Sequence, residues 1–128
     1  SVDEVMEPAC TIDIEERVVH LRRRMLDDGI NRFVVTDNDQ VIGIVTETDV
    51  AVAMRNFREV VEDRHQDHRI RNLLVKDIMS SPLIYVDRGA SIPDVIGMML
   101  SKGIGSVPVT ERQRVVGVVT RAGLVNAL

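Results

Sequence analysis

The chain contains much of its sequence twice, and this internal repeat limits the folds that it can adopt. At a separation of 74 residues, GIVT (43–46) matches GVVT (117–120), and the glycine of DGI (28–30) matches that of KGI (102–104). Near the start of each copy the separation is 73, so VDEVM (2–6) matches VKDIM (75–79). Such a repeat predicts two similar structural units within the 128 residues.

The residue pattern of each copy predicts the element order strand, helix, strand, strand, helix. Short apolar strands are expected near 9–12 and 83–86, and polar hairpin turns are expected within 32–46 and 106–120. Helices are expected from Ile14 to Gly29, from Ser91 to Gly103, over 48–57 and over 122–128. We therefore predict an α/β (α+β) fold with one β-α-β-β-α repeat at 1–57, a charged connector at 58–74 and a second repeat at 75–128. We expect the two repeats to pack sheet to sheet with pseudo-two-fold symmetry.

The composition argues against several classes of function. Apolar residues make up 45% of the chain and charged residues 28%, as in ordinary soluble domains, but aromatic residues make up only 2%. Few aromatic side chains and a net charge of −4 both argue against nucleic acid as a partner. No apolar run approaches the length of a membrane span, so we expect no membrane partner.

The single cysteine, Cys10, cannot form an internal disulfide, which indicates a reducing compartment. No signal peptide is recognisable at the start of the sequence, and we expect a cytoplasmic protein. The first residue is Ser1, which leaves open whether the chain is part of a longer protein.

The charged connector contains His65 and His68, which are one helical turn apart. Two histidines at this spacing can bind a metal, but no cysteine or third histidine lies nearby in the sequence. A solvated helix face is the simpler interpretation, and we predict no metal site.

Taken together, the matched segments resemble the paired CBS domain, also called a Bateman module. The similar segments are VDEVM and VKDIM, the helix ends DGI and KGI, the strand SVPV, and the phrase GIVTETD, which reads GVVTRAG in the second copy. The resemblance covers nearly the whole chain. It implies a regulatory module that is not an enzyme, needs no cofactor, and binds AMP, ADP, ATP or S-adenosylmethionine in a cleft between the repeats. It also implies a homodimer, a disc of four repeats, that regulates an enzyme or transporter.

An alternative function is a dimerising scaffold that binds no nucleotide. Catalysis is not expected, because the sequence shows no paired acid and base, no activated nucleophile and no metal triad.

The phrase GIVTETD also suggests a nucleotide site on physical grounds. Gly43 and Thr46 end a predicted strand where a helix begins, and the free N–H groups of a helix start favour a phosphate. Asp49 lies one turn further along, where its carboxylate could accept hydrogen bonds from ribose hydroxyls. The same Thr and Asp could equally cap the helix with no ligand present.

The resemblance implies two unequal sites. Site 1 would comprise residues from both repeats: Gly43, Thr46, Asp49, Ser80, Pro82, Leu83, Ile84 and Tyr85. Site 2 would lack the ribose acceptor, because Gly123 stands where Asp49 stands in the first copy. We expect site 2 to be weak or altered, with these residues around it: Met6, Pro8, Cys10, Thr11, Ile12, Arg32 and Thr120.

Two residues of site 2 carry alternatives. Arg32 could bind a phosphate, or it could form a surface salt bridge with Asp37 or Glu111. Cys10 could be reactive, but a buried structural cysteine is the commoner case.

Overall fold

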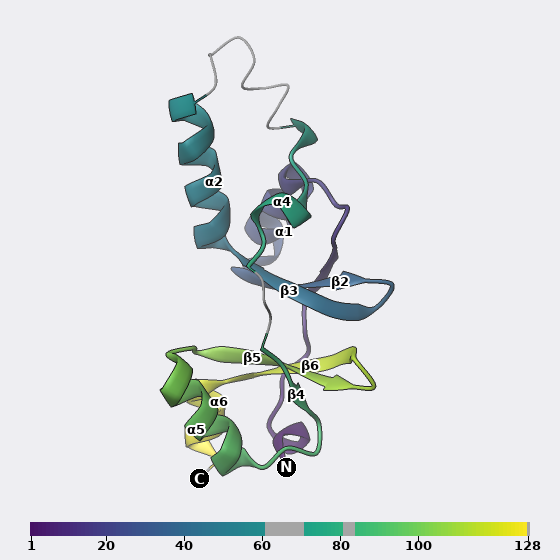
Figure 1. Cartoon of the computed structure of the whole chain (residues 1–128), viewed down its shortest axis with the longest axis vertical. Coiled ribbons are helices and arrows are strands. Elements are labelled where there is room, and N and C mark those ends of the chain that lie inside the picture. The colour runs from purple at the N-terminus through teal and green to yellow at the C-terminus, as the bar shows by residue number, and fades with distance from the viewer. Residues whose placement is uncertain (61–70, 81–83, 128) are drawn as a thin grey trace. The chain divides into compact units, whose positions relative to one another are not determined.

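The computed structural model describes residues 1–60, 71–80 and 84–127, with only the backbone described at 57–60 (Figure 1). The predicted order strand, helix, strand, strand, helix is confirmed in both repeats. The first repeat and its preceding turn comprise η1 (Val2–Glu4), β1 (Thr11–Asp13), α1 (Val18–Asp28), β2 (Arg32–Asp37), β3 (Gln40–Thr46) and α2 (Glu47–Val60). The second comprises α4 (Val75–Ile78), β4 (Val86–Asp87), α5 (Ile92–Lys102), β5 (Ser106–Glu111), β6 (Arg114–Thr120) and α6 (Arg121–Asn126).

Three predicted helix ends are confirmed: the C-terminal ends at Gly29 and Gly103, and the N-terminal end at Ser91. Gly29 and Gly103 follow α1 and α5 with φ of 67° each, the left-handed conformation that glycine adopts without steric cost. At the start of α5, the Ser91 hydroxyl accepts a hydrogen bond of 3.2 Å from the Asp94 N–H.

Both hairpins turn through two residues of positive φ, which matches the twist of the flanking strands. The turn residues are Asn38 and Asp39 in the first hairpin and Arg112 and Gln113 in the second. The polar turn predicted within 32–46 is therefore a tight turn. It is repeated in the second copy without the Asn and Asp that favour such turns.

The contacts of the chain divide it into two compact units, and neither unit is one sequence repeat. Unit 1 comprises Ser1–Ala9, Asp39–Val41 and Ile84–Leu128, and unit 2 comprises Cys10–Asn38 and Ile42–Leu83. Unit 1 therefore joins the first segment of repeat one to the body of repeat two. Unit 2 joins the body of repeat one to the first segment of repeat two.

We call residues 2–6 and 75–79 the anchor segments, because each enters the core of its unit through one valine. Val2 and Val75 are completely buried. Val2 donates a backbone hydrogen bond of 2.9 Å to Ala90, and Val75 donates one of 2.8 Å to Glu16. Ala90 and Glu16 are matching positions of the two repeats, so the anchors occupy equivalent places in the two units.

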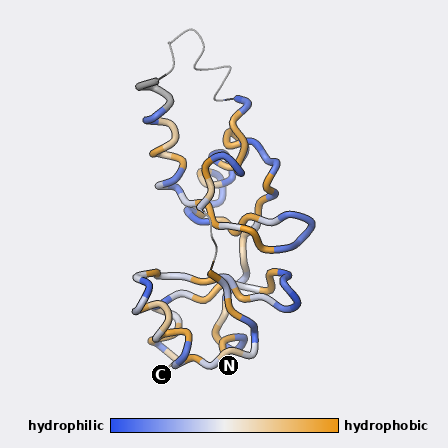
Figure 2. Tube along the Cα trace, viewed as in Figure 1, coloured by the Kyte–Doolittle hydropathy of each residue, from blue (hydrophilic) through white to orange (hydrophobic). Residues whose placement is uncertain are grey.

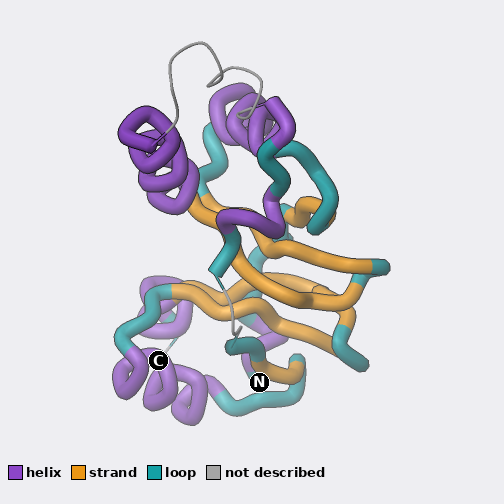
Figure 3. Tube along the Cα trace, turned by 45° about the horizontal axis from the view of Figure 1, so that its top comes forward, coloured by secondary structure: helices purple, strands orange, loops and turns teal. Residues whose placement is uncertain are grey.

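Each unit packs its helices against one face of its own strands (Figures 1 and 3). Strands β1, β2 and β3 are neighbours in unit 2, with β1 parallel to β2, and β4, β5 and β6 are neighbours in unit 1, with β4 parallel to β5. The core of unit 2 includes Phe33, Leu21 and Val45. The core of unit 1 includes Met99, Val107 and Leu124. Both strands and helices contribute apolar residues to these cores (Figure 2). Among the described residues, no helix is long and apolar enough to cross a membrane.

Candidate functional site

The first glycine of each repeated phrase, Gly43 or Gly117, packs against an anchor segment. A Cβ atom at Gly43 would lie 2.9 Å from the Met79 sulfur and 3.0 Å from the Ser80 carbonyl oxygen. At Gly117 it would lie 2.8 Å from both the Met6 sulfur and the Glu7 carbonyl oxygen. Any larger residue would push the anchor segment away, so these glycines are explained by close packing.

The residues that directly follow the two anchors, Glu7 and Ser80, bond the hairpins through backbone groups beside these glycines. Ser80 donates to the Ile44 carbonyl at 2.8 Å in unit 2. In unit 1, Glu7 and Val118 exchange hydrogen bonds of 2.8 and 2.9 Å. Ser80 therefore lies beside the strand that leads into Thr46. Sequence reasoning missed the part played by Met6 and Met79, although the match between VDEVM and VKDIM was a signal for it.

Thr46 and Asp49 form a reciprocal cap at the start of α2. The Asp49 N–H donates to the Thr46 hydroxyl at 3.2 Å, and the Thr46 N–H donates to Asp49 Oδ2 at 2.8 Å. The hydroxyl also donates to Oδ2 at 3.1 Å. Both side chains are half-buried. The capping interpretation is thus realised, and the cap fixes the carboxylate at the helix start.

The start of α6 has only half of this cap. The Gly123 N–H donates to the Thr120 hydroxyl at 3.0 Å, as the Asp49 N–H does to Thr46. Glycine has no carboxylate to return to the Thr120 N–H. Glycine at this position therefore removes the reciprocal hydrogen bond, and the first turn of α6 contains no acidic residue.

Four of the described residues of predicted site 1 lie in unit 2. Gly43, Thr46 and Asp49 come from repeat one, and Ser80 comes from repeat two. Ile84 and Tyr85 belong to unit 1, where Ile84 is half-buried and Tyr85 is 42% exposed. Pro82 and Leu83 lie outside the described residues.

The predicted site 2 residues are divided between the units. Met6, Pro8 and Thr120 lie in unit 1, where Met6 covers Gly117 and Pro8 is exposed. The others lie in unit 2, around β1 and the start of β2: Cys10, Thr11, Ile12 and Arg32.

Of these unit 2 residues, Cys10 is half-buried and packs against the core, which favours the structural interpretation. Arg32 is exposed. Glu111, one of the two acids considered as its partner, bonds Arg88, from Nη1 to Oε2 at 3.1 Å.

A family model of the CBS domain matches residues 2–56 and again residues 75–128. The chain belongs to the CBS domain family. An uncharacterized protein of Methanopyrus kandleri is 29% identical over 107 residues, which cover 82% of this chain and 50% of the relative. The chain spans half or less of the length of the first three curated relatives that it matches.

Solved structures share the CBS pair fold at lower identity. Hypoxic Response Protein I, solved with two coordinated zinc ions, has a TM-score of 0.81 at 20% identity, over 100% of this chain and 98% of that one. The CBS domain pair of protein MJ0100, solved with 5′-methylthioadenosine and S-adenosyl-L-methionine, has a TM-score of 0.75 at 19% identity, over 98% and 93%. At these identities the likeness shows the fold.

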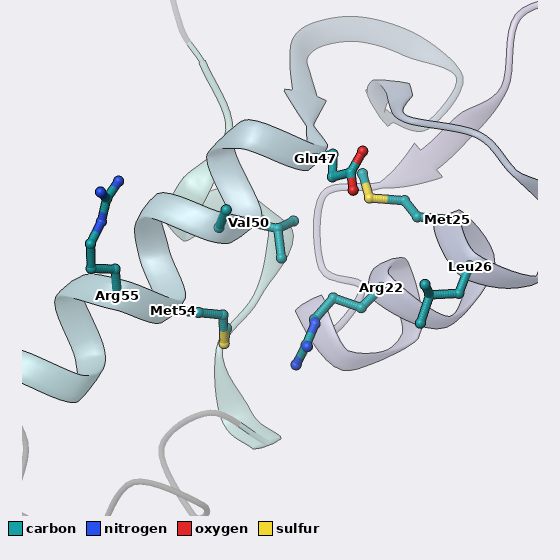
Figure 4. Close-up of a pocket in the computed structure, with 8 residues that line it drawn as sticks. Arg22, Met25, Leu26, Glu47, Val50, Met54 and Arg55 are labelled. Atoms are coloured by element: carbon teal, nitrogen blue, oxygen red, sulfur yellow. The ribbon is translucent and has the colours of Figure 1, made fainter.

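Unit 2 of this CBS pair has a cavity of about 600 Å³ between α1 and α2 (Figure 4). Its floor is apolar, with Met25, Val50 and Met54, and its rim carries charges of both signs. The full lining is Arg22, Met25, Leu26, Glu47, Val50, Ala51, Met54 and Arg55. Thr46 and Asp49 do not line it, so this cavity is distinct from the predicted nucleotide site.

Metal binding gains no support from the described part of the chain. There, no group of three or more His, Cys, Asp and Glu side chains could hold a metal ion. His65 and His68 lie outside the described residues.

Giving α6 the missing half of its cap should stabilise the CBS pair. We expect Gly123→Asp to raise the free energy of unfolding by about 1 kcal/mol, because it removes a helical glycine and supplies a carboxylate to the Thr120 N–H. Urea melts would measure the change. Gly123→Ala is the control, since it changes helix propensity without the carboxylate. Equal stability of the two variants would contradict the capping explanation.

Proposed function

We propose that this chain is a regulatory module that binds an adenosine-containing ligand at Thr46 and Asp49. The cap at the start of α2 carries this proposal. It holds the Asp49 carboxylate through Oδ2, half-buried at the start of a helix of 14 residues. In the proposal, Oδ1 accepts a hydrogen bond from a ribose hydroxyl, and the start of α2 faces the phosphates of a nucleotide or the carboxylate of S-adenosylmethionine.

Two further observations support the site. Ser80 lies beside Ile44, so a residue of each repeat borders the same edge. A structural neighbour holds 5′-methylthioadenosine and S-adenosyl-L-methionine, both of which contain adenosine. AMP, ADP, ATP and S-adenosylmethionine are therefore the ligands to test. The matching position at Thr120 and Gly123 is the weaker site, since no carboxylate is available there.

The test is a thermal shift screen with those four ligands, followed by titration calorimetry. We expect Asp49→Ala to weaken binding by about tenfold to a hundredfold, because hydrogen bonds to a charged acceptor are worth about 1.5–3 kcal/mol each. The chain without Asp49 should also lose about 1 kcal/mol of stability with its cap.

Ser91→Ala is the matched control, because it removes a cap of α5 that is remote in sequence from Asp49. It should cost similar stability and leave the affinity unchanged. If Asp49→Ala binds the ligand as tightly as the parent chain does, Asp49 is a cap only and the proposed site is wrong.

We further propose that the module forms a homodimer through the open cavity between α1 and α2, which we call the groove. Leu26, at the rim, is 81% exposed, and its counterpart in repeat two, Leu100, is 64% exposed. The groove carries Arg22 and Arg55 as well as Glu47, so its charges can pair with those of a second copy. Exposed leucines at matching positions are the observation that also favours the alternative function, a dimerising scaffold.

Leu26→Lys should weaken self-association by about tenfold or more, because it places a charge in an apolar contact. Analytical ultracentrifugation over a concentration series would measure this. Arg23→Glu is a control, a charge change on the same exposed helix outside the groove lining. An unchanged dissociation constant for the Leu26 variant would rule out this interface. Self-association without any ligand-induced shift would favour the scaffold over the sensor.

A further inference from the structure

The two anchor segments are nearly the same in sequence, yet each lies in a different unit. Position by position, Val2 matches Val75, Val5 matches Ile78, and Met6 matches Met79. Each valine is fully buried and each methionine covers a glycine of its unit. The apolar contacts within the two anchors are therefore similar, and the charged residues are the clearest difference between the anchors.

The charge of one position differs between the anchors. Asp3 in the first anchor matches Lys76 in the second, whereas the next position is acidic in both, Glu4 and Asp77. Position 3 or 76 is thus the place within the anchors where a charge is reversed.

Each of these charges faces an opposite charge in the unit that it joins. In unit 2, Lys76 Nζ lies 3.1 Å from Glu15 Oε1. In unit 1, Asp3 Oδ2 lies 3.5 Å from Arg88 Nη2, and Arg88 is fixed by Glu111 at 3.1 Å. Hydrogen bonding by the Ser1 hydroxyl, and the nearby Arg88, hold the pKa of Asp3 below its ordinary value, so Asp3 is charged at neutral pH.

An anchor in the other unit would meet a like charge. Asp3 in the place of Lys76 would face Glu15, and Lys76 in the place of Asp3 would face Arg88. Each attraction would then become a repulsion.

We propose that Asp3 and Lys76 act as a charge code that assigns each anchor segment to its unit. The assignment has a consequence for the edge that holds Thr46 and Asp49. It places Ser80 beside Ile44 in unit 2 and Glu7 beside Val118 in unit 1. The code therefore determines which residues border each of the two repeated phrases, and this holds whether or not a nucleotide binds.

A cysteine competition in the full chain tests the code. In a Cys10→Ser background, the substitutions Glu7→Cys, Ser80→Cys and Val118→Cys let the thiol introduced at position 118 pair with the thiol that directly follows either anchor. Glu7 and Val118 are directly paired across the strands, which suits the Cα separation of a disulfide. The chain is equilibrated with reduced and oxidised glutathione. Peptide mapping of the monomer band then gives the ratio of the 7–118 disulfide to the 80–118 disulfide.

We expect the 7–118 disulfide to dominate in this chain. Adding Asp3→Lys with Lys76→Asp should lower the ratio by about tenfold or more, because two attractions become two repulsions. The uncharged pair Asp3→Asn with Lys76→Gln should give an intermediate ratio, and it provides the measurement if the reversed chain does not fold. Glu4→Lys is the matched control on the same anchor and should leave the ratio unchanged.

An unchanged ratio in the charge-reversed chain would overturn the code. A lower melting temperature with an unchanged ratio would overturn it too, because the ion pairs would then stabilise the fold without selecting the anchor. If the reversed chain does not fold, an unchanged ratio in the uncharged chain has the same meaning.

Discussion

Replacing Gly117 with valine should destabilise the protein by about 2–4 kcal/mol, a large fraction of the stability of a small domain. The added Cβ would lie 2.8 Å from the Glu7 carbonyl oxygen, which belongs to the backbone and cannot rotate away. The anchor segment would have to move, and the hydrogen bonds between Glu7 and Val118 would break with it. Urea melts followed by circular dichroism would measure the loss.

Gly97→Ala is the matched control for this prediction. Gly97 is exposed in the middle of α5, and a Cβ there would meet nothing within 4 Å. Alanine should therefore raise stability by about 1 kcal/mol through helix propensity. If Gly117→Val melts like the parent chain, the close approach of the anchor does not explain why glycine stands in the repeated phrase.

Removing the ring of Phe33 should have the largest effect on stability. Phe33 is completely buried in the core of unit 2, and Phe→Ala changes in cores cost about 3–5 kcal/mol. The Arg24 guanidinium carbon lies 4.6 Å from the ring centre, so the change also removes a cation–π contact. We expect the melting midpoint to fall by about 10–20 °C in calorimetry.

Tyr85→Ala is the control for an aromatic side chain that is not in a core, since Tyr85 is 42% exposed. It should change the midpoint by only a few degrees. Arg24→Ala would separate the cation–π contact from the buried area, although it also removes the hydrogen bond of 2.8 Å from Arg24 Nη1 to the Thr11 carbonyl. If the Phe33 variant melts within a few degrees of the parent, the core of unit 2 repacks to fill the space left by the ring.

The sequence was sufficient to predict the local structure of each repeat. The glycines after α1 and α5, the serine before α5 and the two hairpins all have short-range physical causes, which a sequence displays directly. Boundaries were less well predicted: β1 begins at Thr11 and α1 at Val18, later than the apolar pattern indicated. Short strands are hard to locate because few alternating residues mark them.

The candidate site was only partly predictable. The phrase GIVTETD gave Gly43, Thr46 and Asp49, but their sequence positions did not distinguish a cap from a ligand. The structure shows that Thr46 and Asp49 bond each other, which makes the capping role a fact and leaves the ligand role as a proposal. The sequence did not show why positions 43 and 117 are glycine. The residues that pack against them lie more than 30 positions away in the chain: Met79 and Ser80 at Gly43, and Met6 and Glu7 at Gly117.

By itself, the sequence determined that there are two repeats, what the element order is in each, and that the second copy has Gly123 where the first has Asp49. Those properties depend on periodicity and residue type within a few positions. Only the tertiary structure showed that each repeat gives its first segment to the other unit. Each anchor has a buried valine and a half-buried methionine, and its place also depends on contacts, including ion pairs, that join residues far apart in the chain.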